Sequence, residues 1–201
     1  MTNLHNEAKC PNSIANEIAK TVSINSKKTT SNYYYSLAEQ FIVIKIKPDG
    51  HCGFNSIMKI LTLKNVKFKN VLSFRICISK LFDQFKEQLL KDMAFKSVMK
   101  KKVFEDKLKA RIYRQGMSEY GCGKDHWMQD YTTIPVIACM FPGQKFMTYC
   151  PKNNHTSIWI KERNSDKVTN HFGNYFIHPE KESVCILFDG ISHYHALSII
   201  Y

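Results

Sequence analysis

The stretch Pro48-Asp49-Gly50-His51-Cys52-Gly53-Phe54-Asn55 lies between an apolar, β-branched run at 41–46 and a segment whose apolar residues recur at helical spacing. Pro-Asp-Gly is typical of a turn. The sequence therefore predicts a strand, a tight turn and a helix that begins at Cys52. A cysteine in the first turn of a helix meets unpaired N–H groups and the positive end of the helix dipole, which favour its thiolate form. Cys52 is the first candidate nucleophile.

A second stretch, Asp189-Gly190-Ile191-Ser192-His193-Tyr194-His195-Ala196-Leu197, supplies a candidate imidazole. It follows an apolar run at 184–188, so the sequence predicts a hairpin with His193 at the end of a sheet. Alternate side chains of a strand share one face, so His193 and His195 lie on the same face at different heights. A fold that brings Cys52 beside His193 creates the thiol and base that nucleophilic catalysis needs.

The order of the remaining elements predicts the fold class. Helical spacing of apolar residues favours helices at about 52–63, 72–90 and 93–113, and Thr133 is a candidate cap for a short helix that reaches about 141, with Pro135 in its first turn. Short strands are expected at 145–150, 157–161, 184–188 and 195–201. Helices followed by strands indicate an α+β domain in which helices pack on a small sheet.

Composition divides the chain into two parts and suggests its location. Residues 1–36 are rich in Asn, Ser, Thr and Lys, which predicts a flexible polar tail before a domain at 37–201. The N-terminus carries no apolar block and no run is long enough to span a bilayer, so we expect a cytoplasmic protein, with the nucleus as the alternative and no membrane partner. The seven cysteines are odd in number and contain no Cys-x-x-Cys, which fits a reducing compartment.

The net charge of +12 is concentrated in one region, because residues 91–114 contain nine Lys or Arg and three Asp or Glu. Such a patch could bind nucleic acid. Lysine outnumbers arginine there and aromatic residues are not interleaved, so a solvated helix face is the favoured interpretation and nucleic acid the weaker candidate partner.

Two short patterns resemble half of a zinc site: Cys122-x-x-x-His126 and His193-x-His195. A structural zinc needs four clustered ligands, and no second close pair completes either pattern. We therefore expect no metal and no organic cofactor.

The residues around Cys52 and His193 resemble two motifs of the ovarian-tumour (OTU) family of cysteine proteases. Asp49-Gly50-His51-Cys52-Gly53-Phe54 is similar to the family's Asp-Gly-x-Cys-x-Phe box, and Ser192-His193-Tyr194-x-Ala-Leu197 is similar to its histidine box. Between them, His126-Trp127-Met128 and the following helix resemble the family's tryptophan segment. The resemblance covers about 40–201 and is closest to OTU domains of mobile elements and eukaryotic parasites.

This resemblance implies a papain-type fold with a mainly antiparallel sheet, and a thiol-dependent deubiquitinase that cleaves after the C-terminal glycine of ubiquitin or a ubiquitin-like protein. Carried over by position, Cys52 is the nucleophile, His193 the general base and Asp49 the acidic residue of the first box. Asp49 shapes the oxyanion loop, to which Gly50 and His51 belong, or assists the triad.

One position departs from the family pattern. Many members place Asp or Asn two residues after the catalytic histidine, where it orients the imidazole, and here that residue is His195. A neutral imidazole stabilises an imidazolium less than a carboxylate does. His195 is therefore the candidate orienter, and a catalytically weak or inactive ubiquitin-binding module is the alternative function.

Overall fold

The structure is a computed structural model that describes residues 32–92, 98–112, 118, 120–165 and 167–200. Helices and strands follow one another along these residues in the order α2 (Asn32–Gln40), β1 (Phe41–Ile44), α3 (Cys52–Leu63), α4 (Val71–Asp92), α5 (Val98–Ile112), η2 (Lys124–His126), α6 (Asp130–Ala138), β2 (Lys145–Cys150), η3 (Pro151–Asn153), β3 (His155–Lys161), β4 (Val168–Gly173), β5 (Val184–Phe188) and β6 (Tyr194–Ile199).

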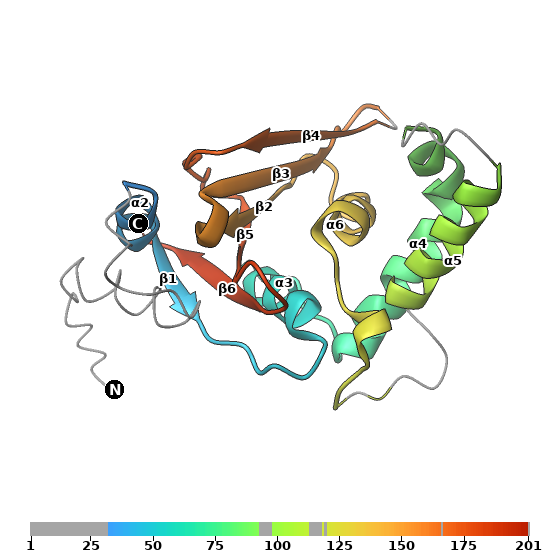
Figure 1. Ribbon diagram of the computed structural model, residues 1–201, viewed down its shortest axis with the longest axis horizontal. Coiled ribbons are helices and arrows are strands. Elements are labelled where there is room, and N and C mark those ends of the chain that lie inside the picture. The colour runs from blue at the N-terminus through green and yellow to red at the C-terminus, as the bar shows by residue number, and fades with distance from the viewer. Residues whose placement is uncertain (1–31, 93–97, 113–117, 119, 166, 201) are drawn as a thin grey trace.

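The strands form one six-stranded sheet in the order β1-β6-β5-β2-β3-β4 (Figure 1). Four of its neighbouring pairs are antiparallel, and β2 and β5 run parallel. The predicted α+β class is confirmed, and the sheet is mixed with mainly antiparallel pairing.

Helices cover both faces of this sheet, which gives the protein two apolar cores. Alternation along β5 shows the division: Val184 and Ile186 face the larger core beneath α3, α4 and α6, whereas Cys185 and Leu187 face the smaller core beneath α2. In Figure 1, α2 accordingly lies apart from α3 and α6. Helix α3 packs against β5 and β6, so its first turn is close to the sheet end at which β6 begins.

The helix predicted to begin at Cys52 begins there, and the strands at 145–150 and 184–188 have the predicted bounds. Residues 32–36 correct the predicted tail, because they form the start of α2. Tyr33 of this helix is buried, and its hydroxyl donates to the carbonyl oxygen of His155 over 2.7 Å. The rest of the predicted tail, 1–31, lies outside the described residues.

Two other elements differ from the sequence prediction. The short helix α6 begins at Asp130 rather than after Thr133, so Pro135 lies inside it. Thr133 instead accepts a hydrogen bond from the Gln129 amide, with 3.2 Å between N and Oγ1. Strand β4 was not predicted: it is an edge strand, and its exposed Asn and His residues lack the apolar alternation of a half-buried strand.

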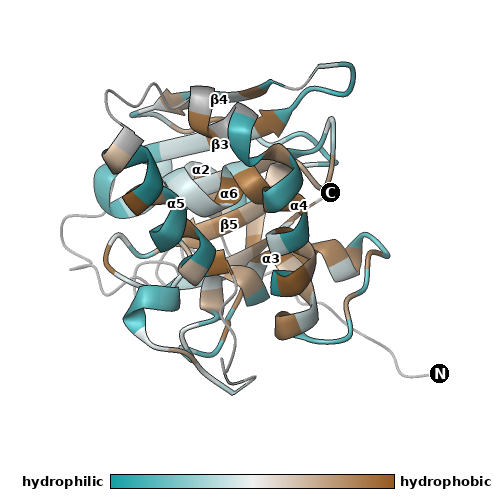
Figure 2. Cartoon of the chain, turned by 90° about the vertical axis from the view of Figure 1, so that its right-hand side faces the viewer, coloured by the Kyte–Doolittle hydropathy of each residue, from teal (hydrophilic) through white to brown (hydrophobic). Residues whose placement is uncertain are grey.

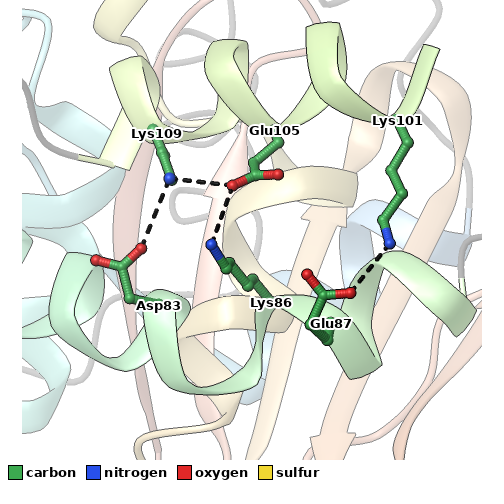
Figure 3. Close-up of polar contacts among 6 residues, drawn as sticks. All are labelled: Asp83, Lys86, Glu87, Lys101, Glu105 and Lys109. Carbon is green, nitrogen blue, oxygen red and sulfur yellow. Dashed lines mark hydrogen bonds and ion pairs between the residues drawn. The ribbon is translucent and has the colours of Figure 1, made fainter. Parts of the chain in front are cut away.

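The basic region forms the outer helix α5, whose residues are largely hydrophilic (Figure 2). Its lysines pair with acidic residues of α4 and of α5 itself (Figure 3): Lys101 Nζ is 3.1 Å from Glu87, and Lys109 Nζ is 3.0 Å from Glu105 and 3.7 Å from Asp83. Part of the positive charge is thus matched within the helix pair. Within the described ranges, no helix combines the length and apolar character needed to cross a bilayer.

Candidate active site

The loop before α3 is shaped by Asp49. One carboxylate oxygen accepts the backbone N–H of His51 over 2.8 Å, and the other accepts the side-chain amide of Asn55 over 3.3 Å. Gly50 has φ +82°, and a Cβ there would lie 2.3 Å from the carbonyl oxygen of Cys122. Only glycine fits this conformation and this approach without displacing the backbone. Asp49 therefore holds the turn that delivers Cys52 to the start of α3.

The thiol of Cys52 faces the segment that carries His193. Its Sγ lies 4.0 Å from the carbonyl oxygen of Ser192, and the backbone N–H groups of Tyr194 and Gly53 also hydrogen-bond to it. Cys52 is 6 % exposed, and burial raises the pKa of its thiol more than these N–H groups lower it. The resting site thus holds a protonated thiol, whereas the helix start alone favoured a thiolate.

His193 is held by a turn built around Asp189. One carboxylate oxygen of Asp189 accepts the backbone N–H groups of Ile191, Ser192 and His193 at 2.7, 2.8 and 3.0 Å. Gly190, at φ +82°, closes this turn. The Asp-Gly-x-Ser sequence is a signal for such a side-chain-capped turn. Asp189 therefore positions His193 through the backbone.

The imidazoles of His193 and His195 lie against each other and share one backbone partner. Their ring centroids are 4.3 Å apart at an interplanar angle of 80°. His193 Nε2 is 3.0 Å from the carbonyl oxygen of Ile46, and the N–H of Ile46 donates to His195 Nδ1 over 3.3 Å. His195 is buried, and burial, followed by the neighbouring His193, lowers its pKa to about 4.

His51 does not point its ring into the site. The ring is fully buried, with Nδ1 2.8 Å from Arg75 Nη1 and Nε2 2.8 Å from the carbonyl oxygen of Ser118. Arginine only donates, so Nδ1 accepts and Nε2 carries the proton. Burial lowers the pKa of His51. Its backbone belongs to the loop, while its side chain joins the loop to residues beyond α5.

Arg75 of α4 holds the buried hydrogen bonds behind the loop, and the sequence analysis did not identify it. Its buried guanidinium donates to the carbonyl oxygens of Ile112 over 2.7 Å and of His126 over 2.6 Å, donates also to that of Arg111, and lies 4.0 Å above the Phe54 ring. Carbonyls at the end of α5 carry the negative end of the helix dipole, which suits a cation. The sequence feature that could have indicated this role is a single arginine among apolar residues at helical spacing.

A cavity of about 430 Å³ opens beside the turn that carries His193, although neither His193 nor Cys52 lines it. Its lining includes Ser192 and Tyr194, which flank His193, and Met128, whose side chain covers Gly53 at the start of α3. Trp127, from the predicted tryptophan segment, lines the same cavity. The cavity adjoins the candidate nucleophile through Ser192, whose carbonyl oxygen lies 4.0 Å from Cys52 Sγ.

The described part of the chain contains no group of three or more His, Cys, Asp or Glu residues that could hold a metal ion. No family model matches the chain, and a search of curated proteins finds no relative.

Proposed function

We propose that this protein is a cysteine-type isopeptidase of the OTU kind, with Cys52 as nucleophile and His193 as general base. The observation that carries the proposal is the contact of the Cys52 thiol with the backbone on both sides of His193, across 140 residues of sequence. The motif resemblance supports the same pair.

The reaction is acyl transfer. The unprotonated ring nitrogen of His193 takes the thiol proton as Sγ bonds to the carbonyl carbon of the substrate glycine. The resulting imidazolium gives that proton to the lysine amine as the C–N bond breaks. Water, deprotonated by His193, then attacks the thioester, which releases the glycine carboxylate and restores the thiol.

Backbone N–H groups of the α3 start are suited to stabilise the oxyanion. The His51 N–H is engaged by Asp49, whereas the Cys52 N–H lies in the first helical turn, where amides have no intrahelical partner. Donors fixed before the reaction stabilise developing charge at little reorganisation cost. The Asp49 turn therefore serves the oxyanion loop rather than the orientation of His193.

The cavity bordered by Ser192 and Tyr194 is the candidate site for the Gly-Gly end of ubiquitin or a ubiquitin-like protein. Its lining combines apolar Met128 and Tyr194 with charged residues of both signs, which are Arg111, Lys124, Asp125 and Asp130. The resemblance to OTU proteases implies a substrate without bulky side chains next to the scissile bond.

A ubiquitin derivative with an electrophile at its C-terminus tests the proposal. Wild-type protein is expected to gain the mass of one probe, and Cys52→Ala is expected to gain none. Cys122→Ala is the matched control, since Cys122 lies at the loop but bonds to the Gly50 carbonyl, and it should still be labelled. No labelling of folded wild-type protein would contradict the isopeptidase.

The raised pKa of the Cys52 thiol favours a second candidate, a catalytically silent ubiquitin-binding module. This module would bind unmodified ubiquitin, with a dissociation constant measurable by calorimetry, and would leave the electrophilic probe unreacted. Binding together with Cys52-dependent labelling supports the enzyme.

A further inference from the structure

We infer that the backbone carbonyl of Ile46 orients the imidazole of His193, and that His195 is a positioning residue that holds Ile46 in place. The inference deepens the proposed function and rests on it for its catalytic meaning. It assigns the orienting role to a main-chain group, whereas the resemblance to the OTU histidine box suggested the side chain of His195.

The proton positions follow from hydrogen-bonding chemistry. A carbonyl oxygen only accepts, so the contact of 3.0 Å between Ile46 O and His193 Nε2 places the proton of neutral His193 on Nε2. The lone pair is then on Nδ1, which is the nitrogen left to act as base. An N–H only donates, so the contact of 3.3 Å from Ile46 N places the lone pair of His195 on Nδ1.

Ile46 is well placed for this role because three contacts fix it. Its side chain packs against the larger core, its N–H binds His195, and its C=O binds His193. Ile46 lies two residues after β1, an edge strand paired with β6, and His193 lies just before β6, so the paired strands bring Ile46 and the two histidines to the same end of the sheet. A rigid carbonyl dipole also stabilises the imidazolium formed during catalysis.

His195 acts through Ile46 and stays neutral. A cation at 195 would oppose the imidazolium at His193, whose ring centroid is 4.3 Å away. Neutral His195 avoids that repulsion and still accepts the Ile46 N–H. His195 stands where many OTU proteases have the residue that orients the catalytic histidine. Here it holds Ile46, whose carbonyl takes over that role.

Nitrogen NMR of the imidazole rings tests the proton positions without any substrate. Protein labelled with ¹⁵N-histidine should show the Nε2–H tautomer for neutral His193 and for neutral His195 at pH 7.5. A proton on Nδ1 of His193 would overturn the inference and leave the proposed function untouched.

Two substitutions test the positioning role. His195→Asn places an amide oxygen near the position of Nδ1 and should keep the Nε2–H tautomer of His193 and a labelling rate close to wild type. His195→Leu removes the acceptor at similar volume and should slow labelling by the ubiquitin electrophile at least about tenfold, because a small misplacement of a reacting group can cost about a hundredfold in rate. His193 in that variant should show exchange between tautomers.

A histidine-to-leucine substitution at the opposite edge of the sheet, on β4, is the control. His171 lies exposed on β4, and His171→Leu should leave the labelling rate and the His193 tautomer unchanged. Equal labelling of His195→Leu and wild type would overturn the positioning role of His195. Wild-type protein that shows the expected tautomers but takes no probe would retain the Ile46 contact and lose the proposed isopeptidase.

Discussion

The thiol of Cys52 lies 4.0 Å from the carbonyl oxygen of Ser192, although 140 residues separate them in the chain. Each side of this contact is held by an aspartate that caps backbone N–H groups, Asp49 before α3 and Asp189 before β6. A glycine at φ +82° follows each aspartate. The candidate site is therefore built from two similar turns, each set against a rigid element.

Gly50→Ala should destabilise the protein and abolish labelling by the ubiquitin electrophile. A Cβ at Gly50 would lie 2.3 Å from the Cys122 carbonyl oxygen, and the left-handed conformation costs a further 1 kcal/mol or so for a residue other than glycine. We expect a loss of about 2 kcal/mol or more in the free energy of unfolding, measured with urea.

The matched control for that substitution is Gly123→Ala. Gly123 has φ −71°, and nothing lies within 4 Å of a Cβ built on it. Its unfolding free energy should stay within about 0.5 kcal/mol of wild type. A Gly50→Ala protein as stable as Gly123→Ala would contradict the close approach of the two loops.

Asp189→Ala should weaken the turn that presents His193. Three backbone N–H groups lose a charged acceptor, which we expect to cost about 2 kcal/mol of unfolding free energy. Asp189→Asn retains an oxygen acceptor and should recover most of that loss and most of the labelling rate. If Asn and Ala variants behave alike in urea unfolding, the capping role of Asp189 is wrong.

The sequence specified the elements around the site better than the contacts between them. The bounds of α3, β2 and β5 could be predicted because apolar periodicity and turn residues are local signals. Strand β4 could not, since its exposed edge position requires no apolar alternation. The start of α2 was missed because its buried residues sit among polar ones in a region whose average composition is that of a tail.

The candidate site shows the same division. Cys52, His193 and the turn at Gly50 were predicted from side-chain chemistry and spacing, and Gly50 does lie in a turn, with φ +82°. The role of Ile46 has no sequence signal, since any residue supplies a carbonyl. Arg75 was missed because its partners are mostly main-chain carbonyls, which leave no pattern of opposite charges to find.

Arg75→Met should destabilise the protein by about 3 kcal/mol, because the buried carbonyl oxygens of Ile112 and His126 and the Nδ1 of His51 lose their donor. Urea unfolding measures this loss. Lys101→Met, in the exposed pair with Glu87, is the matched control and should change stability by less than about 0.5 kcal/mol. Similar losses for the two variants would refute a structural role for the guanidinium.

The buried imidazole of His195 should make the folded state lose stability in acid. Its pKa is about 4 in the folded protein and 6.5 for an unperturbed histidine, so between these pH values the unfolded state binds a proton that the folded state excludes. The free energy of unfolding therefore falls as pH decreases from 6.5 towards 4, by up to about 1.4 kcal/mol per pH unit from this group. The charged or titratable groups that act on His195 are His193, Lys45 and Asp189, of which only Asp189 favours the protonated ring.

Replacing His195 measures how much its imidazole contributes to the loss of unfolding free energy in acid. Urea unfolding at pH 7.0 and pH 5.0 should show a smaller loss of stability for His195→Asn than for wild type, because an amide does not titrate. His51 is also buried with a lowered pKa, so both proteins keep a common remaining slope from that residue. An identical loss in the two proteins would mean that His195 is protonated as readily in the folded state as in the unfolded chain, which is incompatible with its acceptance of the Ile46 N–H.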